Sequence, residues 1–281
     1  AEVAAAAPAN DWIAIPPSDL LVMDLAPDAK GKARRVVIQL IPAPFSQQWI
    51  DNIRKLAAAH WWDGTSVNRV QDNYVAQWGD ATEKKALPAG LAAVGEGAYS
   101  VALEAIAFRT RPERMGRYLE AKGTDGKVFA GGPLVKQDPY ADASLLWKGW
   151  PLAMQGDAKD GVIFNMKTYA WPVHCYGMVG VGRNMSPDTG SGAELYTVIG
   201  HAPRHLDRNI AVVGRVISGI EHLSSLPRGT GALGFYEDEA ERVPIKSIRL
   251  ATDLPAADQP KFEYLSTESD SFARYADARQ N

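Results

Sequence analysis

The sequence predicts a mainly β protein, an antiparallel barrel or sandwich whose ends are closed by helices. Three observations support this fold class. The chain contains about eight short segments with the alternating or continuous apolar pattern of strands. Only two main helical patterns lie among these segments. Those helices follow pairs of strands and do not alternate with single strands, which argues against a parallel sheet.

The first part of the chain is predicted to form two strands and a helix. The first 19 residues are rich in Ala and Pro, and we expect them to run extended over the surface. Residues 20–25 and 35–41 have strand patterns, and the Pro, Asp and Gly between them favour a hairpin. Ser46 can cap a helix that runs to about Ala59. One apolar face of that helix is made by Trp49, Ile50, Ile53 and Leu56.

A strand pair over residues 67–80 brings polar groups together. The pattern predicts two strands joined by a turn at Asp72–Asn73, with Tyr74 beside the turn. Period-two spacing then places Arg69 and Gln77 on one face of the sheet. A cation, an amide and an aromatic ring on one face could begin a site. The competing interpretation is that Arg69 is an ordinary solvated strand residue.

Residues 81–173 are broken by Gly, Pro and Asp at short intervals, as in Gly131-Gly132-Pro133 and Asp138-Pro139. This punctuation predicts loops and short hairpins, with one strand near residues 103–108. It argues against an independent helical domain in this segment.

Strand patterns return after Cys175. The predicted strands are residues 176–182, 194–199, 211–216 and 244–251, with a turn at 203–207 and short helices at 218–226 and 271–279. Glycines in the first of these strands permit either the close approach of another chain or a bend within a barrel. The loop at residues 183–193 has neither a GxGxxG pattern nor a helix amino terminus, so we exclude a nucleotide site there.

Composition limits the classes of partner and compartment. The chain has 281 residues and a net charge of −3, so no general attraction to nucleic acid is expected. It has no run of 18 apolar residues, so we expect no membrane span. Cys175 is the single cysteine, which excludes an intramolecular disulfide and any CxxC site. The start AEVAAAAP predicts a periplasmic or secreted protein whose signal peptide has been removed; a shortened recombinant chain is the alternative.

Two blocks of the sequence resemble one family. The first block, residues 51–80, contains Val67-Asn68-Arg69 and Gln77-Trp78-Gly79-Asp80. The second block, residues 177–216, combines a small-residue strand with the sequences Gly192-Ala-Glu-Leu-Tyr196, His205-Leu206-Asp207 and Val213-Gly-Arg-Val216. In this order the blocks resemble the cyclophilin-type peptidyl-prolyl cis-trans isomerases, in particular exported bacterial members with a large middle insertion.

The resemblance implies a closed eight-stranded antiparallel barrel capped by two helices. One cyclophilin-like domain would cover residues 20–252, with residues 81–173 as a long loop and hairpin insertion. Residues 1–19 would form an extended amino-terminal segment, and residues 253–281 a tail with a short helix. The implied function is isomerisation of X-Pro bonds to assist protein folding. Its partners would be proline-containing peptides or unfolded proteins, it would need no cofactor or metal, and it would act as a monomer.

The resemblance also assigns roles to single residues. The catalytic positions are occupied by Arg69, which stands where the family has its catalytic arginine, and by Glu194, which replaces the glutamine beside it. The substrate-binding positions are occupied by Tyr74, Val75, Gln77, Gly182, Arg183, Tyr196, His205 and Leu206. His205 stands where many members have tryptophan, and Ile210 stands where many have histidine.

The chemistry of X-Pro rotation explains why these residue types would be needed. The barrier is roughly 20 kcal/mol because the twisted state loses amide resonance. A guanidinium can donate to the pyramidal prolyl nitrogen of that state, while an apolar pocket holds the ring. We expect a carboxylate at Glu194 to pair with Arg69, which would either fix the guanidinium or neutralise it. The sequence therefore predicts a working isomerase that is slower than one with glutamine at this position.

The same residues could instead have purely structural roles. Arg69 could be a structural ion-pair partner of Glu194, and Tyr74, Tyr196 and Leu206 could be ordinary barrel core. The protein would then be a non-catalytic cyclophilin-like module that binds proline peptides or acts as a chaperone.

Histidines near the second block do not indicate other chemistry. His174 and Cys175 are adjacent on a predicted strand and therefore point to opposite faces, which excludes a nucleophile and base pair. His201 and His205 have no acidic or histidine partner at the spacing of a metal site.

Overall fold

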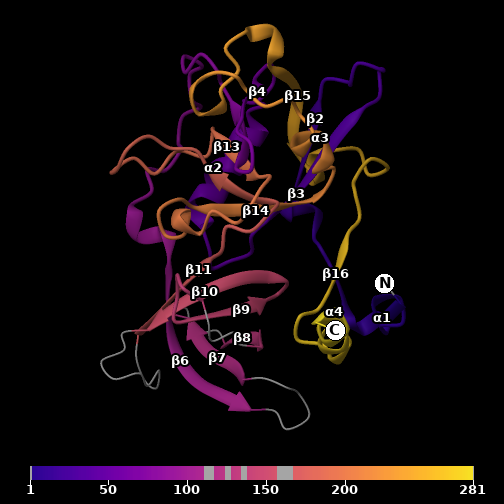
Figure 1. Cartoon of the computed structure of the whole chain (residues 1–281), viewed down its shortest axis with the longest axis vertical. Helices are drawn as coiled ribbons and strands as arrows, with labels where there is room; N and C mark the ends of the chain where they lie inside the picture. The colour runs from indigo at the N-terminus through magenta and orange to yellow at the C-terminus, as the bar shows by residue number, and fades with distance from the viewer. Residues whose placement is uncertain (1, 111–116, 124–127, 134–137, 157–166, 281) are drawn as a thin grey trace. The chain divides into compact units, whose positions relative to one another are not determined.

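The computed structural model describes residues 2–110, 117–123, 128–133, 138–156 and 167–280. The chain divides into two compact units, which Figure 1 shows coloured along the sequence. The barrel unit comprises Pro16–Tyr99 and His174–Pro260. The sheet unit comprises Ala1–Ile15, Ser100–Val173 and Lys261–Asn281. The expected insertion, residues 81–173, is therefore divided between the two units after Tyr99.

The barrel unit is a closed barrel of eight strands in which every neighbouring pair is antiparallel. In chain order the strands are β2 (Leu20–Leu25), β3 (Arg34–Leu40), β4 (Ser66–Val70), β5 (Val75–Gly79), β12 (Met178–Val181), β13 (Leu195–Val198), β14 (Val212–Ser218) and β15 (Val243–Leu250). Around the barrel they follow the order β12-β13-β5-β4-β15-β2-β3-β14. The predicted eight-stranded antiparallel barrel is confirmed, and each of its predicted strands is present with small shifts at the ends.

Two helices cover outer faces of the barrel. Leu20, Leu21, Val22 and Met23 are all at most 1% exposed, so β2 is buried on both faces and needs a cover on its outer side. Helix α2 (Gln47–Ala58) packs on β14 and β15, and α3 (Glu221–Ser224) packs on β3. The apolar face predicted for α2 is confirmed, because its four residues are each no more than 1% exposed.

The ends of these helices differ from the sequence prediction. Ser46 does not cap α2, because its hydroxyl donates to the Val212 carbonyl oxygen at 2.7 Å and ties the helix start to β14. Helix α3 is shorter than the predicted 218–226, since β14 continues to Ser218 and Gly219 follows with a φ of 80°. A left-handed residue there separates strand from helix.

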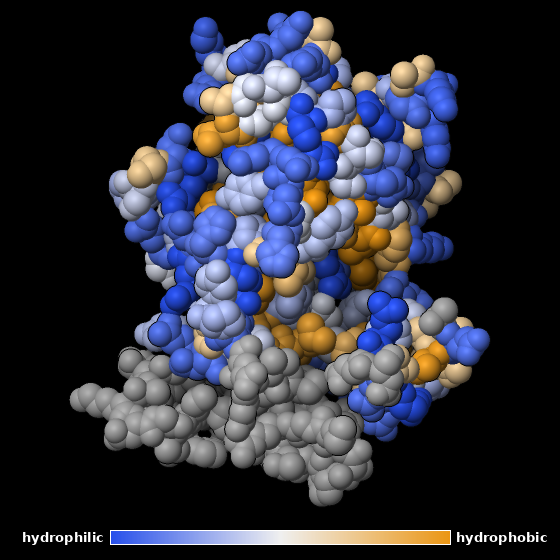
Figure 2. All heavy atoms as spheres, viewed as in Figure 1, coloured by the Kyte–Doolittle hydropathy of each residue, from blue (hydrophilic) through white to orange (hydrophobic). Residues whose placement is uncertain are grey.

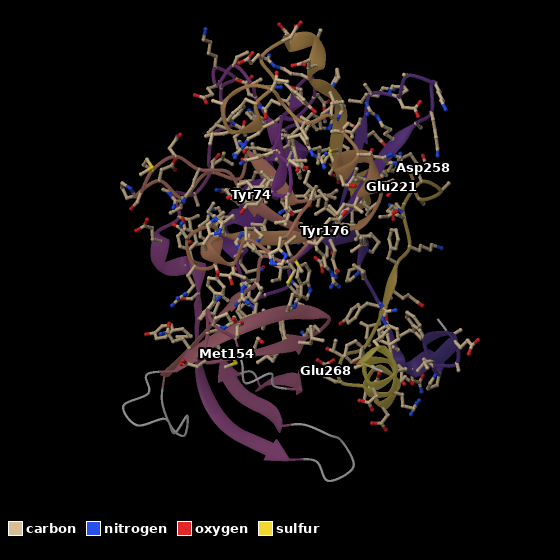
Figure 3. The ribbon with its side chains drawn as sticks, viewed as in Figure 1. Tyr74, Met154, Tyr176, Glu221, Asp258 and Glu268 are labelled. Carbon is tan, nitrogen blue, oxygen red and sulfur yellow. The ribbon has the colours of Figure 1, made fainter. Side chains whose placement is uncertain are left out.

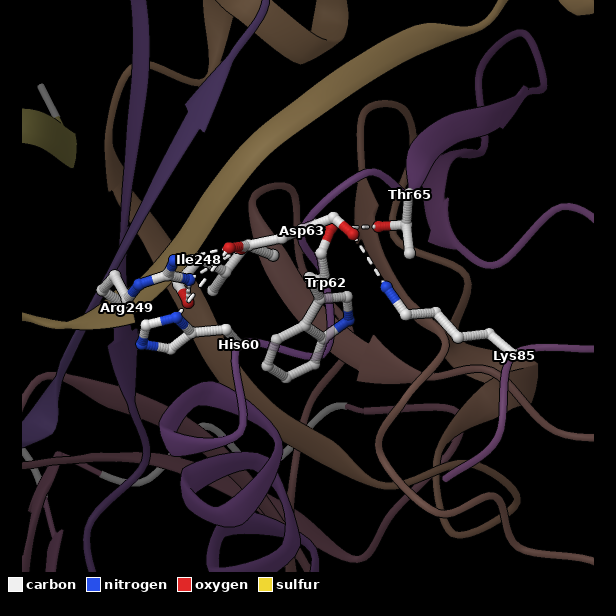
Figure 4. Close-up of polar contacts among 7 residues, drawn as sticks. All are labelled: His60, Trp62, Asp63, Thr65, Lys85, Ile248 and Arg249. Atoms are coloured by element: carbon white, nitrogen blue, oxygen red, sulfur yellow. Dashed lines mark hydrogen bonds and ion pairs between the residues drawn. The ribbon is translucent and has the colours of Figure 1, made fainter. Parts of the chain in front are cut away.

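The connection from α2 to β4 is tied to the closing strand, as Figure 4 shows. Arg249 donates to both carboxylate oxygens of Asp63, at 2.7 and 2.6 Å. Lys85 Nζ donates to the Asp63 carbonyl oxygen at 2.7 Å. A bidentate arginine–carboxylate pair fixes orientation as well as distance. These contacts hold the approach to β4 against β15, and they anchor the segment that follows β5.

The sheet unit contains a six-stranded antiparallel sheet in the order β8-β7-β6-β11-β10-β9. Its strands are β6 (Val101–Thr110), β7 (Arg117–Gly123), β8 (Val128–Pro133), β9 (Ala143–Trp147), β10 (Trp150–Gly156) and β11 (Lys167–Pro172). The expectation of hairpins is confirmed for the described parts of this segment, although β6 is longer than predicted. The parts of the expected insertion at 111–116, 124–127, 134–137 and 157–166 lie outside the described residues.

The two ends of the chain also belong to the sheet unit. Strand β1 (Trp12–Ala14) pairs with β16 (Glu263–Leu265), and helix α1 (Glu2–Ala5) packs on α4 (Asp270–Gln280). The Ala-rich start was expected to be extended. It forms a short helix because Ala has the highest helix propensity and α4 offers a packing surface. Helix α4 matches the predicted carboxy-terminal helix closely.

The described surface is largely polar. In the view of Figure 2, hydrophilic side chains dominate and hydrophobic atoms form scattered patches. None of the helices in the described part of the chain has the length and apolar character needed to cross a membrane.

Candidate active site

A groove of about 750 Å³ on the barrel unit collects almost all of the predicted site residues. Its lining includes Arg69, Tyr74, Val75, Gln77, Gly182, Arg183, Glu194, Tyr196 and Leu206. His205 is exposed outside this lining and stacks on Tyr74, with ring centroids 6.1 Å apart. Figure 3 labels Tyr74 on the barrel unit. Residues from two distant blocks of the sequence therefore meet in one place.

The β4–β5 hairpin sets the position of Arg69. Asn73 adopts a φ of 48° in the turn, as expected from the predicted turn at Asp72–Asn73. Arg69 is the register partner of Gln77, and a bulge precedes it on β4. Bulges re-aim side chains and are common beside functional sites. Arg69 Nη1 donates to Gln77 Oε1 at 3.0 Å, so the two side chains share one face as predicted.

All of the hydrogen-bond acceptors around the Arg69 guanidinium are neutral. Besides Gln77, Nη2 donates to Gln71 Oε1 at 2.5 Å and Nε donates to the Leu233 carbonyl oxygen at 2.7 Å. Burial lowers the pKa of Arg69 from its ordinary value, which still leaves the group cationic. The guanidinium is thus held by neutral acceptors, and none of the described residues pairs a carboxylate with it.

The expected direct pairing of Arg69 with Glu194 is wrong, because Gln77 stands between them. In the described part of the chain, the Glu194 carboxylate accepts hydrogen bonds from the Gln77 side-chain amide and from the Asp80 backbone N–H. No ion pair there joins it to Arg69. A Cβ atom on Gly79 would lie only 1.9 Å from Glu194 Oε1, so the carboxyl group rests directly on that glycine.

Burial raises the pKa of Glu194 to about 7, and the like charges of Asp80 and Glu83 add to the shift. The hydrogen bonds from Gln77 and Asp80 oppose it. This carboxyl group therefore changes its charge near neutral pH, whereas an ordinary glutamate is ionised there.

An apolar floor lies beside the guanidinium. Val75, Tyr196, Val198 and Leu206 form one buried cluster, against which Tyr74 and Ile210 pack. Most of these residues also line the groove. The same side chains therefore belong to a core cluster and line the groove, and their role as a proline pocket stays a prediction.

The guanidinium of Arg183 donates hydrogen bonds to two neighbouring asparagines. Its Nε donates to the Asn209 carbonyl oxygen at 3.0 Å, Nη1 donates to the Asn184 carbonyl oxygen at 2.6 Å, and Nη2 donates to Asn209 Oδ1. Gly182 lies beside Gln77 and Glu194, where a Cβ would approach Glu194 Cβ to 2.9 Å. The peptide-binding roles predicted for both residues stay predictions.

A buried polar chain under the floor was missed in the sequence. His174 is 0% exposed, and its Nε2 lies 2.8 Å from the Tyr196 hydroxyl. Its Nδ1 lies 2.9 Å from Asp207 Oδ1, and Arg204 Nε donates to Asp207 Oδ2 at 2.6 Å. Burial raises the pKa of Asp207, but the bonds from His174 and Arg204 outweigh it and leave that pKa below its ordinary value.

A loop that follows α3 was missed as well. The Phe235 ring lies under the guanidinium, with 5.4 Å between Arg69 Cζ and the ring centroid, and Tyr74 is 5.8 Å away. Phe235 is also joined to Arg69 by a backbone bridge. Phe235 and Leu233 are 40% and 66% exposed at the groove. Nothing in the loop's local sequence signals this role.

Among the described residues, no group of three His, Cys, Asp or Glu side chains is arranged to hold a metal ion. The histidines that could have suggested one have other partners. His174 belongs to the chain with Asp207, and His205 stacks on Tyr74.

Comparisons with known proteins agree with this geometry. The family model of cyclophilin type peptidyl-prolyl cis-trans isomerases matches residues 30–250. A search of curated proteins finds no match. Among solved structures, the cyclophilin AquaCyp293 from Hirschia baltica is similar, with a TM-score of 0.64 and 20% sequence identity. That match covers 95% of this chain and 86% of the other, and at this identity it supports the fold alone.

Proposed function

Because the chain belongs to the cyclophilin-type peptidyl-prolyl cis-trans isomerase family, it is a peptidyl-prolyl isomerase, and we propose that the groove around Arg69 is its active site. The observation that carries this assignment is the environment of the guanidinium. It is fixed by three neutral acceptors beside a buried apolar floor. A cation that three hydrogen bonds orient beside an apolar surface suits the needs of a twisted X-Pro bond.

In this proposal the proline ring of the substrate binds on the cluster of Val75, Tyr196 and Leu206, with Tyr74 at its side. A guanidinium has five N–H donors, and the three bonds above leave one N–H free on each Nη. In the twisted state the prolyl nitrogen regains a lone pair, and one of these N–H groups donates to it. The planar states offer no such lone pair, so the bond lowers the barrier.

The remaining predicted residues take supporting roles in this proposal. Gln77, Gly182 and Arg183 lie along the groove where they can hold the peptide backbone. His205 supports the Tyr74 ring by stacking. Glu194 contacts the site through Gln77 and not through the substrate.

Proline-containing segments of unfolded proteins are the substrates that fit an open groove of this size, and catalysis of their isomerisation would assist folding. Export of the protein, its action as a monomer and its lack of affinity for nucleic acid stay predictions from the sequence. Fractionation of the source cells, light scattering and a nucleic-acid binding titration would test them.

An isomerisation assay on a proline-containing peptide tests the assignment of the site. Wild type is expected to accelerate cis-trans exchange. Arg69→Ala should lose roughly 10- to 100-fold in kcat/KM, as expected for removal of a hydrogen bond from a charged donor. Arg69→Lys should recover little, since an ammonium cannot keep all three fixed bonds. Full activity in Arg69→Ala would place the active site elsewhere. Peptide binding by wild type without acceleration would select the non-catalytic module.

A further inference from the structure

We propose that Glu194 is a positioning residue for Arg69, and that it acts by fixing which way the Gln77 side-chain amide faces. The inference rests on the proposed role of Arg69 in the groove. It replaces the direct ion pair expected from the sequence with a chain of three side chains, Arg69, Gln77 and Glu194.

The direction of hydrogen bonding along this chain is set at both ends. An amide side chain has an oxygen acceptor and an NH₂ donor of nearly the same shape, and either end can face a neighbour. Arg69 can only donate, so Gln77 must present Oε1 to it. An ionised Glu194 can only accept, so Gln77 must present its NH₂ group there. Both demands select the same orientation of the amide.

Two glycines, Gly79 and Gly182, make the space that the Gln77–Glu194 contact occupies. A Cβ on Gly79 would meet the Glu194 carboxyl group at 1.9 Å. A Cβ on Gly182 would lie 2.9 Å from Glu194 Cβ and 3.5 Å from Gln77 Nε2. Two positions without side chains thus flank the Gln77–Glu194 contact, and the Asp80 backbone N–H holds the carboxylate from the remaining side.

Protonation of Glu194 removes the preference for this one orientation of the Gln77 amide. A protonated carboxyl group carries an O–H donor, which can point at Gln77 Oε1 and compete with Arg69 for that oxygen. The pKa of Glu194 is about 7, so the carboxylate is present above neutral pH and is lost as the pH falls through 7. The orientation of Arg69 should therefore be best defined on the alkaline side.

Several other charged groups lie near Glu194. Burial raises the pKa of Asp80, but backbone N–H donors from residues 82, 84 and 85 outweigh it, so Asp80 stays ionised. Glu83 faces Glu194 from the same segment, and Arg183, beyond Gly182, is bound to Asn209 and Asn184. His174 contacts the pocket through the hydroxyl of Tyr196.

The test is the pH profile of kcat/KM for wild type and Glu194→Gln between pH 5.5 and 8.5. Wild type should lose roughly tenfold between pH 8.5 and 5.5, with a midpoint near 7. Glu194→Gln should lack this transition, because an amide side chain does not change its charge in this pH range.

Glu83→Gln is the matched control. It removes a nearby carboxylate that is outside the chain of three side chains, so the transition should persist. Its midpoint should move to lower pH, because the Glu83 charge contributes to the raised pKa of Glu194. Identical profiles for wild type and Glu194→Gln would overturn the inference. A Glu194→Gln enzyme that is uniformly faster at every pH would also overturn it, since the carboxylate would then weaken Arg69 by its charge.

A second readout separates this inference from the proposed function. The side-chain amide resonances of Gln77, followed by NMR, should shift with the same midpoint in wild type and stay constant in Glu194→Gln. If the protein isomerises peptides but these resonances do not titrate, the positioning role is wrong. If they titrate but no isomerisation occurs at any pH, the proposed function of the groove fails while the coupling stands.

Discussion

The hydroxyl of Tyr196 lies 2.8 Å from Nε2 of His174, and both residues are buried. Gly180, the cross-strand partner of Tyr196, makes room for it, because a Cβ there would come within 2.3 Å of the hydroxyl oxygen. Asp207 fixes the other side of the imidazole ring through Nδ1. With Nδ1–H donating to the carboxylate, Nε2 is the acceptor for the Tyr196 hydroxyl. The ring that forms the pocket floor is therefore held from below by a buried polar chain.

Removal of this hydroxyl should destabilise the fold and loosen the pocket. Tyr196→Phe leaves Nε2 of the fully buried His174 without a donor, which costs about 1–3 kcal/mol in the free energy of unfolding. Urea denaturation measures that loss. The affinity for a proline peptide should also fall, because the phenyl ring keeps its area but loses its anchor.

A double-mutant cycle with His174→Phe separates the contact from general damage to the core. The double variant should lose less stability than the sum of the two single variants, since either change alone already breaks the bond. Strict additivity would show that the hydroxyl and the imidazole do not act on each other.

Phe235 should support the Arg69 guanidinium through its aromatic face. It lies in the loop that the sequence did not connect to the site. Phe235→Leu keeps an apolar side chain on the loop but removes the aromatic face 5.4 Å from Arg69 Cζ. A partly exposed cation–π contact contributes about 0.5–1 kcal/mol, so kcat/KM should fall a few-fold. Phe235→Tyr keeps the aromatic face and should retain wild-type kcat/KM. Equal losses in both variants would mean that packing, and not the ring face, supports the guanidinium.

The parts of the site that were predicted from the sequence share a local origin. Arg69 and Gln77 lie on one hairpin, so a turn at Asp72–Asn73 and period-two spacing were enough to bring them together. Tyr196 and Leu206 came from the family resemblance, which fixed their order along the chain. The strand patterns predicted an antiparallel barrel or sandwich, and the family resemblance selected the closed barrel.

The parts that were missed depend on contacts between distant segments. The loop with Leu233 and Phe235 reaches Arg69 across more than a hundred and fifty residues of sequence, and its residues carry no motif. His174 was dismissed as half of a catalytic pair, and its true partners are Asp207 and Tyr196. The orientation of the Glu194 side chain could not be predicted from the sequence either. Its carboxylate turns toward Gly79 because that residue has no Cβ atom.

Glu194 should also make the free energy of unfolding depend on pH. Its pKa is raised from 4.5 to about 7 in the folded state, mainly by burial. Between these values the folded chain holds a proton that the unfolded chain has released, so stability falls as the pH rises from 4.5 to 7 and then levels off. The full shift corresponds to about 3 kcal/mol, and partial solvent access reduces it to about 1–3 kcal/mol.

Glu194→Gln removes the free-energy cost of ionising a buried Glu194, without changing the shape of the side chain. The variant should be more stable than wild type by about 1–3 kcal/mol at pH 8.5 and by much less at pH 5, as measured by urea unfolding at both values. Asp63 gives a contrast of opposite sign, since its hydrogen bonds with Arg249 lower its pKa and its contribution is lost only in acid. An equal gain at both pH values would show that the neutral amide simply packs better. A gain confined to alkaline pH would show that the charge which orients Gln77 toward Arg69 is kept at the expense of stability.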